Sequence, residues 1–251
     1  MKLENRVAIV TGGANGIGRG ITLRLAQEGA DVVVADIDLD GANKVIQEIE
    51  TLGRRGLAIK TDVSKSEEVK AMTKTVLDKL GKVDILVNNA GGSARERKSL
   101  FKDSTEEVWD YVIGINYKGV LNCCRAVINH MIDRRYGKIV NIGSISADGG
   151  SSEQQTVYAG AKGAYISFTM SLAKEVAGYD INVNNISCGP FETEWSDQSP
   201  HKARLEQLTG FGRKGKFEEM SAVVAFLVSD EASFITGQNI PVCGLANISS
   251  L

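Results

Sequence analysis

Short, continuously apolar runs alternate along this chain with longer stretches of helical periodicity. The apolar runs, rich in Val and Ile, lie at residues 6–11, 31–36, 57–61, 83–88, 138–142, 181–186 and 239–242. Such runs are typical of strands buried on both faces of a parallel sheet. Helical spacing occurs at residues 17–28, 41–52, 66–80, 105–134, 157–177 and 217–229. The alternation predicts an α/β fold, a Rossmann-like doubly wound parallel sheet flanked by helices.

Length and composition favour one globular enzyme-sized unit. No linker or repeat divides the 251 residues, so we expect residues 1–251 to form a single dinucleotide-binding and catalytic domain. The net charge of -2, from 29 basic and 31 acidic residues, argues against a nucleic-acid binder that works by phosphate neutralisation. No apolar run approaches the roughly 20 residues that cross a bilayer. The start of the chain lacks a signal core, so we expect a cytoplasmic protein.

The cysteines and histidines do not form a recognisable metal or disulfide pattern. Cys123, Cys124, Cys188 and Cys243 lack CxxC spacing, and the two histidines, His130 and His201, lie far from each other in the sequence. The sequence therefore predicts no metal site and no disulfide scaffold.

A glycine-rich turn follows the first apolar run and opens the first helical stretch. In Thr11-Gly-Gly-Ala-Asn-Gly-Ile-Gly18, Gly12 permits the tight turn, Gly16 lets the backbone approach a pyrophosphate, and Gly18 permits close helix–strand packing. The helix N-terminus offers free N–H groups to phosphates. No Lys-Ser/Thr pair follows the glycines, which excludes the Walker pattern.

The second apolar run ends in a carboxylate, Asp36, 18 positions after Gly18. A carboxylate at this point can accept hydrogen bonds from the adenosine ribose hydroxyls, and it would repel a 2′-phosphate. The alternative is a role in capping the next helix, which Asp38 and Asp40 could also fill. Asp36 lies directly at the strand end, so the sequence favours NAD as the cofactor.

Three polar groups in the second half of the chain suggest proton chemistry. Tyr158 and Lys162 are four residues apart and share one face of a helix. An ammonium beside a phenol favours the phenolate and lowers the phenol pKa. Ser144 follows an apolar run and could hydrogen-bond a reacting oxygen. A Tyr-x-x-x-Lys pair alone usually belongs to an ordinary amphipathic helix without a catalytic role. Its presence beside a nucleotide-binding turn favours the catalytic interpretation here.

Together, four motifs resemble the short-chain dehydrogenase/reductase family over residues 5–242. They are the turn at 11–18, Asn88-Asn-Ala-Gly91, Ser144, and Tyr158-Ala-Gly-Ala-Lys162. The resemblance implies reversible hydride transfer between NAD and a secondary alcohol or ketone, with Tyr158 as the proton donor or acceptor. It also implies that Lys162 holds the nicotinamide ribose, and that Asn116 bends its helix and retains a water in a proton relay.

The resemblance extends to further cofactor contacts. Asp62-Val63 corresponds to an adenine-binding pair, residues 89–91 to the adenosine wall, and Gly189, Phe191 and Thr193 to the nicotinamide segment. The complete predicted cofactor set is Gly12, Asn15, Gly16, Ile17, Gly18, Asp36, Asp62, Val63, Asn89, Ala90, Gly91, Tyr158, Lys162, Gly189, Phe191 and Thr193. Cys188 stands where the family has proline, and we interpret it as a small buried hydrophobe.

Substrate residues are predicted from charge, aromatic surface and the family's usual lid. Residues 194–210 would form the lid. The candidates are Arg95, Arg97, Gln154 and Trp195, with Phe191 as a further aromatic surface. Arg95, Arg97 and the neighbouring Lys98 could hold a carboxylate or the phosphates of coenzyme A, which suggests a hydroxyacyl thioester of an aromatic or alicyclic acid. The alternative is a solvated charge run beside a simple apolar pocket.

Other functions remain open at this point. They are a 3-oxoacyl thioester reductase, a dehydratase or epimerase on the same fold, and a non-catalytic structural subunit of a related dehydrogenase complex. Apolar residues on more than one face of the stretches at 105–134 and 157–177 predict a homotetramer, with a mixed assembly as the alternative. No nucleic-acid or membrane partner is expected, only a small-molecule substrate.

Overall fold

Seven parallel strands form one continuous sheet in the order β3-β2-β1-β4-β5-β6-β7. The computed structural model describes the chain apart from residues 95–96, 98, 150–153, 194–201 and 247–251. The strands are β1 (Val7–Thr11), β2 (Asp31–Asp36), β3 (Gly56–Lys60), β4 (Ile85–Asn88), β5 (Gly137–Ile142), β6 (Ile181–Cys188) and β7 (Asn239–Val242). The doubly wound α/β fold predicted from the sequence is confirmed.

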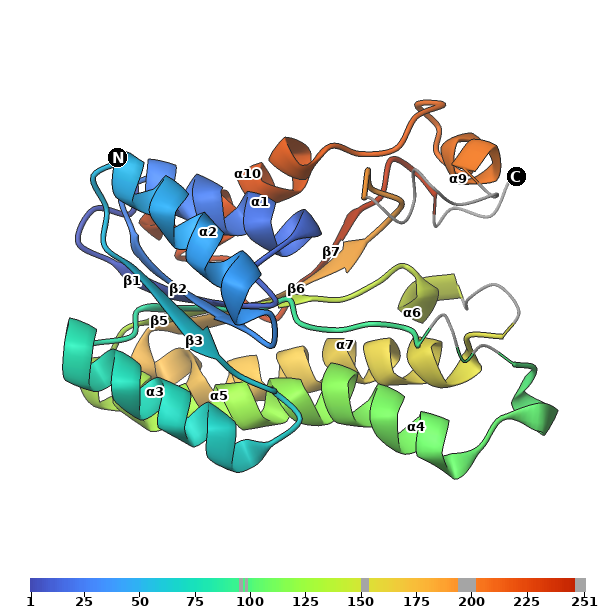
Figure 1. Cartoon of the computed structure of the whole chain (residues 1–251), viewed down its shortest axis with the longest axis horizontal. Helices are drawn as coiled ribbons and strands as arrows, with labels where there is room; N and C mark the ends of the chain where they lie inside the picture. The colour runs from blue at the N-terminus through green and yellow to red at the C-terminus, as the bar shows by residue number, and fades with distance from the viewer. Residues whose placement is uncertain (95–96, 98, 150–153, 194–201, 247–251) are drawn as a thin grey trace.

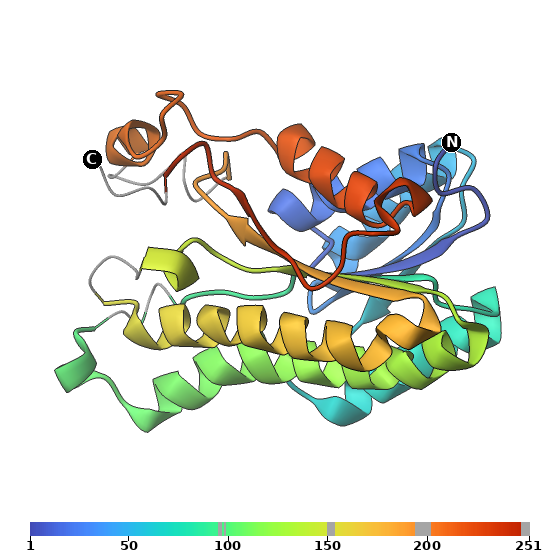
Figure 2. The ribbon, with the colours of Figure 1, turned by 180° about the vertical axis from the view of Figure 1, so that it is seen from behind.

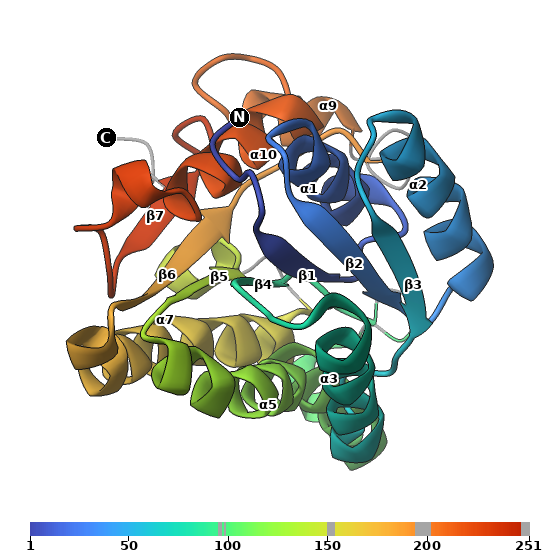
Figure 3. The same cartoon turned by 90° about the vertical axis from the view of Figure 1, so that its left-hand side faces the viewer.

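Helices cover both faces of the sheet (Figures 1 and 3). One layer holds α1 (Gly16–Gln27), α2 (Leu39–Thr51) and α10 (Phe217–Leu227). The other holds α3 (Ser66–Leu80), α4 (Glu106–Ile113), α5 (Gly119–Arg134) and α7 (Thr156–Val176), with α5 and α7 running side by side (Figure 2). Short elements complete the chain: α6 (Ser146–Gly149), α9 (Lys202–Gln207), η2 (Phe101–Asp103), η3 (Gly114–Lys118), η4 (Ala177–Tyr179) and η5 (Asp230–Ala232).

Residues 7–10 of β1 are all apolar because the strand lies between two hydrophobic cores. In β1, Ala8 and Val10 pack with the layer of α1, α2 and α10, whereas Val7 and Ile9 pack with the layer of α3, α5 and α7. Side chains alternate across a strand, so a strand between two helical layers presents successive side chains to one core and then the other. This alternation buries β1 on both faces.

The position of the site follows from the strand order. Chain connections run outward from β1 in one direction and from β4 in the other, so the order reverses between these neighbours. Thr11 at the end of β1 is in register with Asn88 at the end of β4. Ligands of open α/β sheets bind in the crevice beyond the strand ends at such a switch point. The glycine-rich turn and the loop after Asn88 therefore meet there.

The structure differs from the sequence-based elements mainly around the site. The helix expected over 105–134 is interrupted by η3, a π-helical turn. The short helices α6 and α9 were not predicted, since four to six residues give too little periodicity to recognise. Of the predicted lid at 194–210, residues 194–201 lie outside the described part, and α9 occupies most of the remainder. None of the described helices is long and apolar enough to cross a membrane.

Candidate active site

The glycine-rich turn has the shape of a phosphate cradle. Gly12 and Gly16 adopt positive φ values of 63° and 53°, which favour glycine. A Cβ on Gly18 would overlap the carbonyl oxygen of Gly12, whereas a Cβ on Gly16 would meet no atom within 4 Å. The N-cap residue of α1, Asn15, makes no side-chain capping hydrogen bond, and the first turn holds no acidic residue. The turn, including Ile17, thus leaves the positive end of α1 open to a pyrophosphate.

Thr11 ties this turn to the loop after β4. Its Oγ1 accepts hydrogen bonds from the backbone N–H groups of Asn89 (3.0 Å) and Ala90 (3.1 Å). The Asn89 side chain in turn donates to the carbonyl oxygens of Thr11 (3.1 Å) and Gly12 (2.8 Å). Thr11 was not among the predicted site residues, although a hydroxyl at the end of an otherwise apolar run is a signal for such a role.

Asp36 lies at the other side of the turn, 8% exposed. One carboxylate oxygen accepts the backbone N–H of Ala14 at 3.0 Å, and the other accepts that of Asp38 at 3.0 Å. Each oxygen keeps a further lone pair with which to accept a ribose hydroxyl. Asp38 itself caps α2 by accepting from Gly41, so the capping role considered for Asp36 belongs to Asp38.

The predicted adenine pair, Asp62 and Val63, follows β3 and is fixed from two directions. Asn122 on α5 donates to the carbonyl oxygen of Val63 at 2.9 Å. The Asp62 carboxylate accepts from the backbone and hydroxyl of Ser64 (3.0 and 2.7 Å). Partial burial raises the pKa of Asp62, but these hydrogen bonds and Lys65 outweigh burial and leave it below its ordinary value.

Asn116, fully buried within η3, connects the broken helix to the loop after β4. Its side-chain Nδ2 donates to the carbonyl oxygens of Val112 (2.8 Å) and Gly92 (2.7 Å), and its Oδ1 accepts the N–H of Gly92 at 3.2 Å. Bonding of a side chain to the carbonyl four residues earlier accompanies the π turn, a feature frequent at functional sites. Asn116 thus lies in a locally distorted helix, where the resemblance implied a bend.

Lys162 is buried beside Asn116, one turn after Tyr158 on α7. Its Nζ donates to the carbonyl oxygen of Ile142 (2.9 Å) and to the Tyr165 hydroxyl (3.2 Å), and lies 5.9 Å from the ring centroid of Tyr158. Gly91 permits this packing, because a Cβ there would lie 2.6 Å from Asn116 Oδ1 and 3.2 Å from Lys162 Nζ. Burial lowers the pKa of Lys162 to about 7.

Ser144 lies two residues beyond β5, whose last residue, Ile142, accepts from Lys162. Its hydroxyl donates to Ser146 Oγ at 3.0 Å and accepts the N–H of Ser146 at 3.2 Å. The structure therefore gathers Asn116, Ser144, Tyr158 and Lys162 around the ends of β4 and β5.

The nicotinamide segment predicted from the sequence follows β6 directly. Gly189 packs closely against Cys243, since a Cβ added to Gly189 would lie 2.5 Å from the Cα of Cys243. Phe191 is only 5% exposed, and its ring packs on Gly215, so it offers little of the aromatic surface expected for a substrate; Thr193 is half-buried. Cys188, interpreted from the sequence as a small buried hydrophobe, is half-buried and packs against the core beside α1 and α10, and burial raises the pKa of its thiol to about 12.

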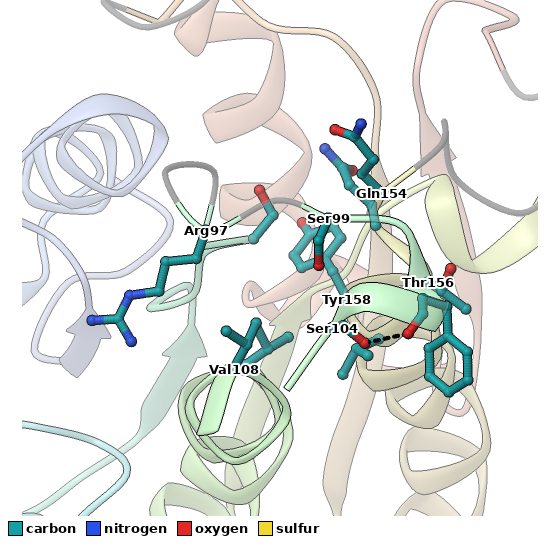
Figure 4. A pocket seen from close by; sticks show the side chains of 12 residues that line it. Arg97, Ser99, Ser104, Val108, Gln154, Thr156 and Tyr158 are labelled. Atoms are coloured by element: carbon teal, nitrogen blue, oxygen red, sulfur yellow. Dashed lines mark hydrogen bonds between the residues drawn. The ribbon is translucent and has the colours of Figure 1, made fainter. Parts of the chain in front are cut away.

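A pocket opens beside Tyr158, between the loop after β4 and the start of α7 (Figure 4). Hydroxyl and amide side chains dominate its wall, with apolar groups from α4 and α7. The lining residues are Ser93, Arg97, Ser99, Phe101, Ser104, Val108, Val112, Gln154, Gln155, Thr156, Val157 and Tyr158. Arg97, Gln154 and Tyr158 among these were predicted from the sequence as site residues. The serines and Phe101 of the loop preceding α4 were not, because that loop has no periodic pattern.

Of the cationic residues predicted to contact the substrate, Arg97 lies within the described part of the chain. Arg97 pairs with Glu107 at 3.0 Å, and its guanidinium points away from Tyr158 (Figure 4). Phe101, which was not predicted, stacks on Trp109 with ring centroids 5.5 Å apart and forms an aromatic wall. Gln154 lines the pocket in a left-handed conformation, with φ 70°. Arg95, Lys98 and Trp195 lie outside the described residues.

Comparison with known proteins gives the family. The profile described as short chain dehydrogenase matches residues 6–204. The chain belongs to the short-chain dehydrogenase/reductase family. It is therefore an oxidoreductase of a family that uses a nicotinamide cofactor. Among the described residues, no group of three or more His, Cys, Asp and Glu side chains is gathered as in a metal site.

Three similar proteins illustrate the range of substrates named for relatives of this short-chain dehydrogenase. A 3-oxoacyl-(acyl-carrier-protein) reductase of Thermotoga maritima is 40% identical over 97% of this chain and 98% of its own. The (2S)-((R)-hydroxy(phenyl)methyl)succinyl-CoA dehydrogenase subunit BbsD of Thauera aromatica is 37% identical over 97% of each chain. The NAD+-bound structure of a xylitol dehydrogenase has a TM-score of 0.88, 30% identity, and coverage of 97% of this chain and 100% of that one.

The buried Lys162 predicts how the stability of the cofactor-free protein depends on pH. Its pKa is about 7 in the fold, against an ordinary 10.5, so between these values the unfolded chain holds a proton that the folded chain has released. The free energy of unfolding therefore gains a contribution from this group as the pH rises. From pH 7 to 9 we expect a gain of about 2 kcal/mol in wild type relative to Lys162→Met, measured by urea unfolding.

The matched control is Lys174→Met, which removes an exposed lysine from the same helix and should leave the wild-type pH dependence unchanged. If the free energy of unfolding changed with pH in the same way for wild type and Lys162→Met, Lys162 would have an ordinary pKa in the fold.

Proposed function

We propose that this short-chain dehydrogenase is NAD-dependent and interconverts a secondary alcohol and a ketone on an acyl thioester. The observation that carries the proposal is a pocket lined by Tyr158, with the buried Lys162 one turn further along α7 and close to Asn116 at Gly91. The phosphate cradle after β1 and Asp36 at the end of β2 belong to the same sheet. Together these residues fit the two halves of a dinucleotide and a substrate placed between the nicotinamide and Tyr158.

Each of these residues has a separate role in the proposed reaction. A bound nicotinamide dinucleotide supplies or accepts the hydride. Tyr158 gives a proton to the carbonyl oxygen, or takes one from the hydroxyl, and Ser144 hydrogen-bonds the same oxygen. Lys162 is buried near the Tyr158 ring, so its ammonium stabilises negative charge on that side chain. With a pKa of about 7, it gives this support mainly near and below neutral pH in the cofactor-free protein.

The thioester class is supported by relatives and by the pocket. Two relatives are named for acyl groups on a carrier, acyl-carrier protein in one and coenzyme A in the other. The wall of neutral hydroxyl and amide groups, with the Phe101–Trp109 stack, suits the acyl body of an aromatic or alicyclic acid. We propose that Arg97 contacts an acidic or phosphate group of the substrate, which would displace Glu107 from its guanidinium.

A 3-oxoacyl thioester reductase is the same chemistry run in the other direction, and the name of the Thermotoga maritima relative favours it as the second candidate. A panel of hydroxyacyl and oxoacyl thioesters, followed by NADH absorbance in both directions, identifies the substrate. Product formation without any change in NADH would instead indicate a dehydratase or epimerase, and no turnover with any member would favour a structural subunit.

We also propose that the protein acts as a homotetramer in the cytoplasm. Exposed apolar side chains on the α4–α5 and α7 surfaces, including Ile113 (44% exposed) and Met170 (44%), support a partner helix there. The Thauera aromatica relative is named a subunit, which keeps a mixed assembly with a related chain as the alternative. Light scattering should give about four times the 26.9 kDa chain mass, and a 26.9 kDa particle at micromolar concentration would contradict the tetramer.

Tyr158→Phe should abolish nearly all turnover while NADH still binds, because it removes the proton-carrying hydroxyl and keeps the ring. Turnover and the Kd for NADH, measured by fluorescence, separate the two effects. Tyr179→Phe, which removes an exposed hydroxyl beyond the far end of α7, is the control. More than a tenth of wild-type turnover in Tyr158→Phe would point to another proton carrier.

Asp36→Ala should relax the cofactor preference. The carboxylate repels a 2′-phosphate, so kcat/KM for NAD should exceed that for NADP by at least about tenfold in wild type, roughly 1.4 kcal/mol. The substitution should shrink that ratio. Asp40→Ala removes an exposed charge from the first turn of α2 and should leave the ratio unchanged. A preference identical in wild type and Asp36→Ala would exclude Asp36 as its source.

A further inference from the structure

Ser93 carries a buried hydroxyl at the wall of the pocket. Its Oγ has essentially no exposed surface and, within the described part of the chain, no hydrogen-bond partner. Leaving a hydroxyl in that state costs about 1–3 kcal/mol. Ser93 lines the same pocket as Tyr158. A buried polar group without a partner at the wall of a binding pocket is suited to a ligand atom.

The backbone on both sides of Ser93 is held in place. Gly92 is clamped at its N–H and its carbonyl oxygen by the side chain of Asn116 (3.2 and 2.7 Å). Ala94, buried, has a φ of 47°, a left-handed conformation that costs a non-glycine residue about 1 kcal/mol or more. Such a conformation persists only where the surroundings impose it. The direction of Ser93 is therefore fixed by its neighbours rather than by its own preference.

We propose that Ser93 is a substrate-binding residue that donates a hydrogen bond to a neutral carbonyl oxygen close to the reacting carbon. This inference rests on the proposed function, in which that atom is the thioester carbonyl of an oxoacyl or hydroxyacyl substrate. Ser93 then determines specificity, because it distinguishes a thioester from an alcohol or ketone of the same shape that lacks the carbonyl.

The chemistry around Ser93 favours a neutral acceptor over an anion. Arg97, a cation at this pocket, is already paired with Glu107 and directed outward. The remaining polar lining consists of hydroxyl and amide groups, which carry no charge. A thioester carbonyl is a neutral acceptor and needs one donor at a defined position. A carboxylate buried here would lack a compensating charge and would be penalised by desolvation.

The test uses two ketones that differ only at the proposed acceptor. One is the N-acetylcysteamine thioester of 3-oxo-3-phenylpropionic acid, and the other is the thioether in which a methylene replaces the thioester carbonyl. In each assay NADH gives its hydride to the ketone carbon and the oxygen takes a proton. Ser93→Ala should lower kcat/KM for the thioester about tenfold, mainly through KM, and change that for the thioether less than twofold.

Controls separate this result from damage to the fold. Ser171→Ala, on an exposed part of α7, should alter neither substrate's kinetics. The Kd for NADH should be the same in Ser93→Ala as in wild type. Equal losses with both ketones, or no loss with either, would overturn the inference and assign the Ser93 hydroxyl a structural or water-binding role.

A binding measurement keeps the two proposals distinguishable. If the wild-type protein reduces neither ketone, the proposed function is overturned, and calorimetric binding of the same thioester to the protein–NADH complex still tests Ser93. The inference predicts a Kd about tenfold weaker in Ser93→Ala. An unchanged Kd, or no binding of the thioester to wild type, would overturn it.

Discussion

The active-site architecture depends on the side-chain amide of Asn116. Three hydrogen bonds, to Val112 and to both backbone groups of Gly92, fix the π turn between α4 and α5 against the loop after β4. Because the amide is buried, leaving any of these groups unpaired would cost roughly 1–3 kcal/mol. Gly91, which precedes Gly92, has no side chain and so leaves room for the side chains of both Asn116 and Lys162. One residue thus joins the π turn to the loop that leads into the pocket wall.

The electrostatics of the site follow from burial rather than from ion pairing. Lys162 hydrogen-bonds a carbonyl oxygen and a phenol hydroxyl, both neutral, and burial lowers its pKa to about 7. A carboxylate partner would instead have favoured the ammonium at all physiological pH values. Asp36 is likewise held by backbone N–H groups, and each of its oxygens keeps a further lone pair. Both groups can therefore respond to a bound ligand.

The sequence predicted the parts of the molecule that follow from periodicity and from short motifs. The apolar runs of β1 and β2, and the i, i+4 pair of Tyr158 and Lys162, are local patterns, so their elements were identified almost to the residue. The break of the helix at Asn116 entered only through family resemblance. Asn116 acts through Gly92, 24 residues away, and such a contact has no local signature.

Residues in irregular segments were the least predictable. Ser93, Phe101 and Thr11 were missed because their roles depend on which strands become neighbours, and Phe191 was expected to be more open than its packing on Gly215 allows. The charge on Arg97 was visible in the sequence, whereas its pairing with Glu107 was not. Side-chain direction in a loop is a tertiary property, since the chain's own pattern does not set it.

The most direct test of this account is a double-mutant cycle between Asn116 and Ser93. The measured quantity is the Kd of the phenyl-substituted oxoacyl thioester for the protein–NADH complex in wild type, Asn116→Ala, Ser93→Ala and the double variant. If Asn116 positions Ser93, the two losses should be strongly non-additive, and Ser93→Ala should weaken binding little further once Asn116 is replaced. Losses that add to within about 0.3 kcal/mol would show that the two residues act independently and would contradict the account.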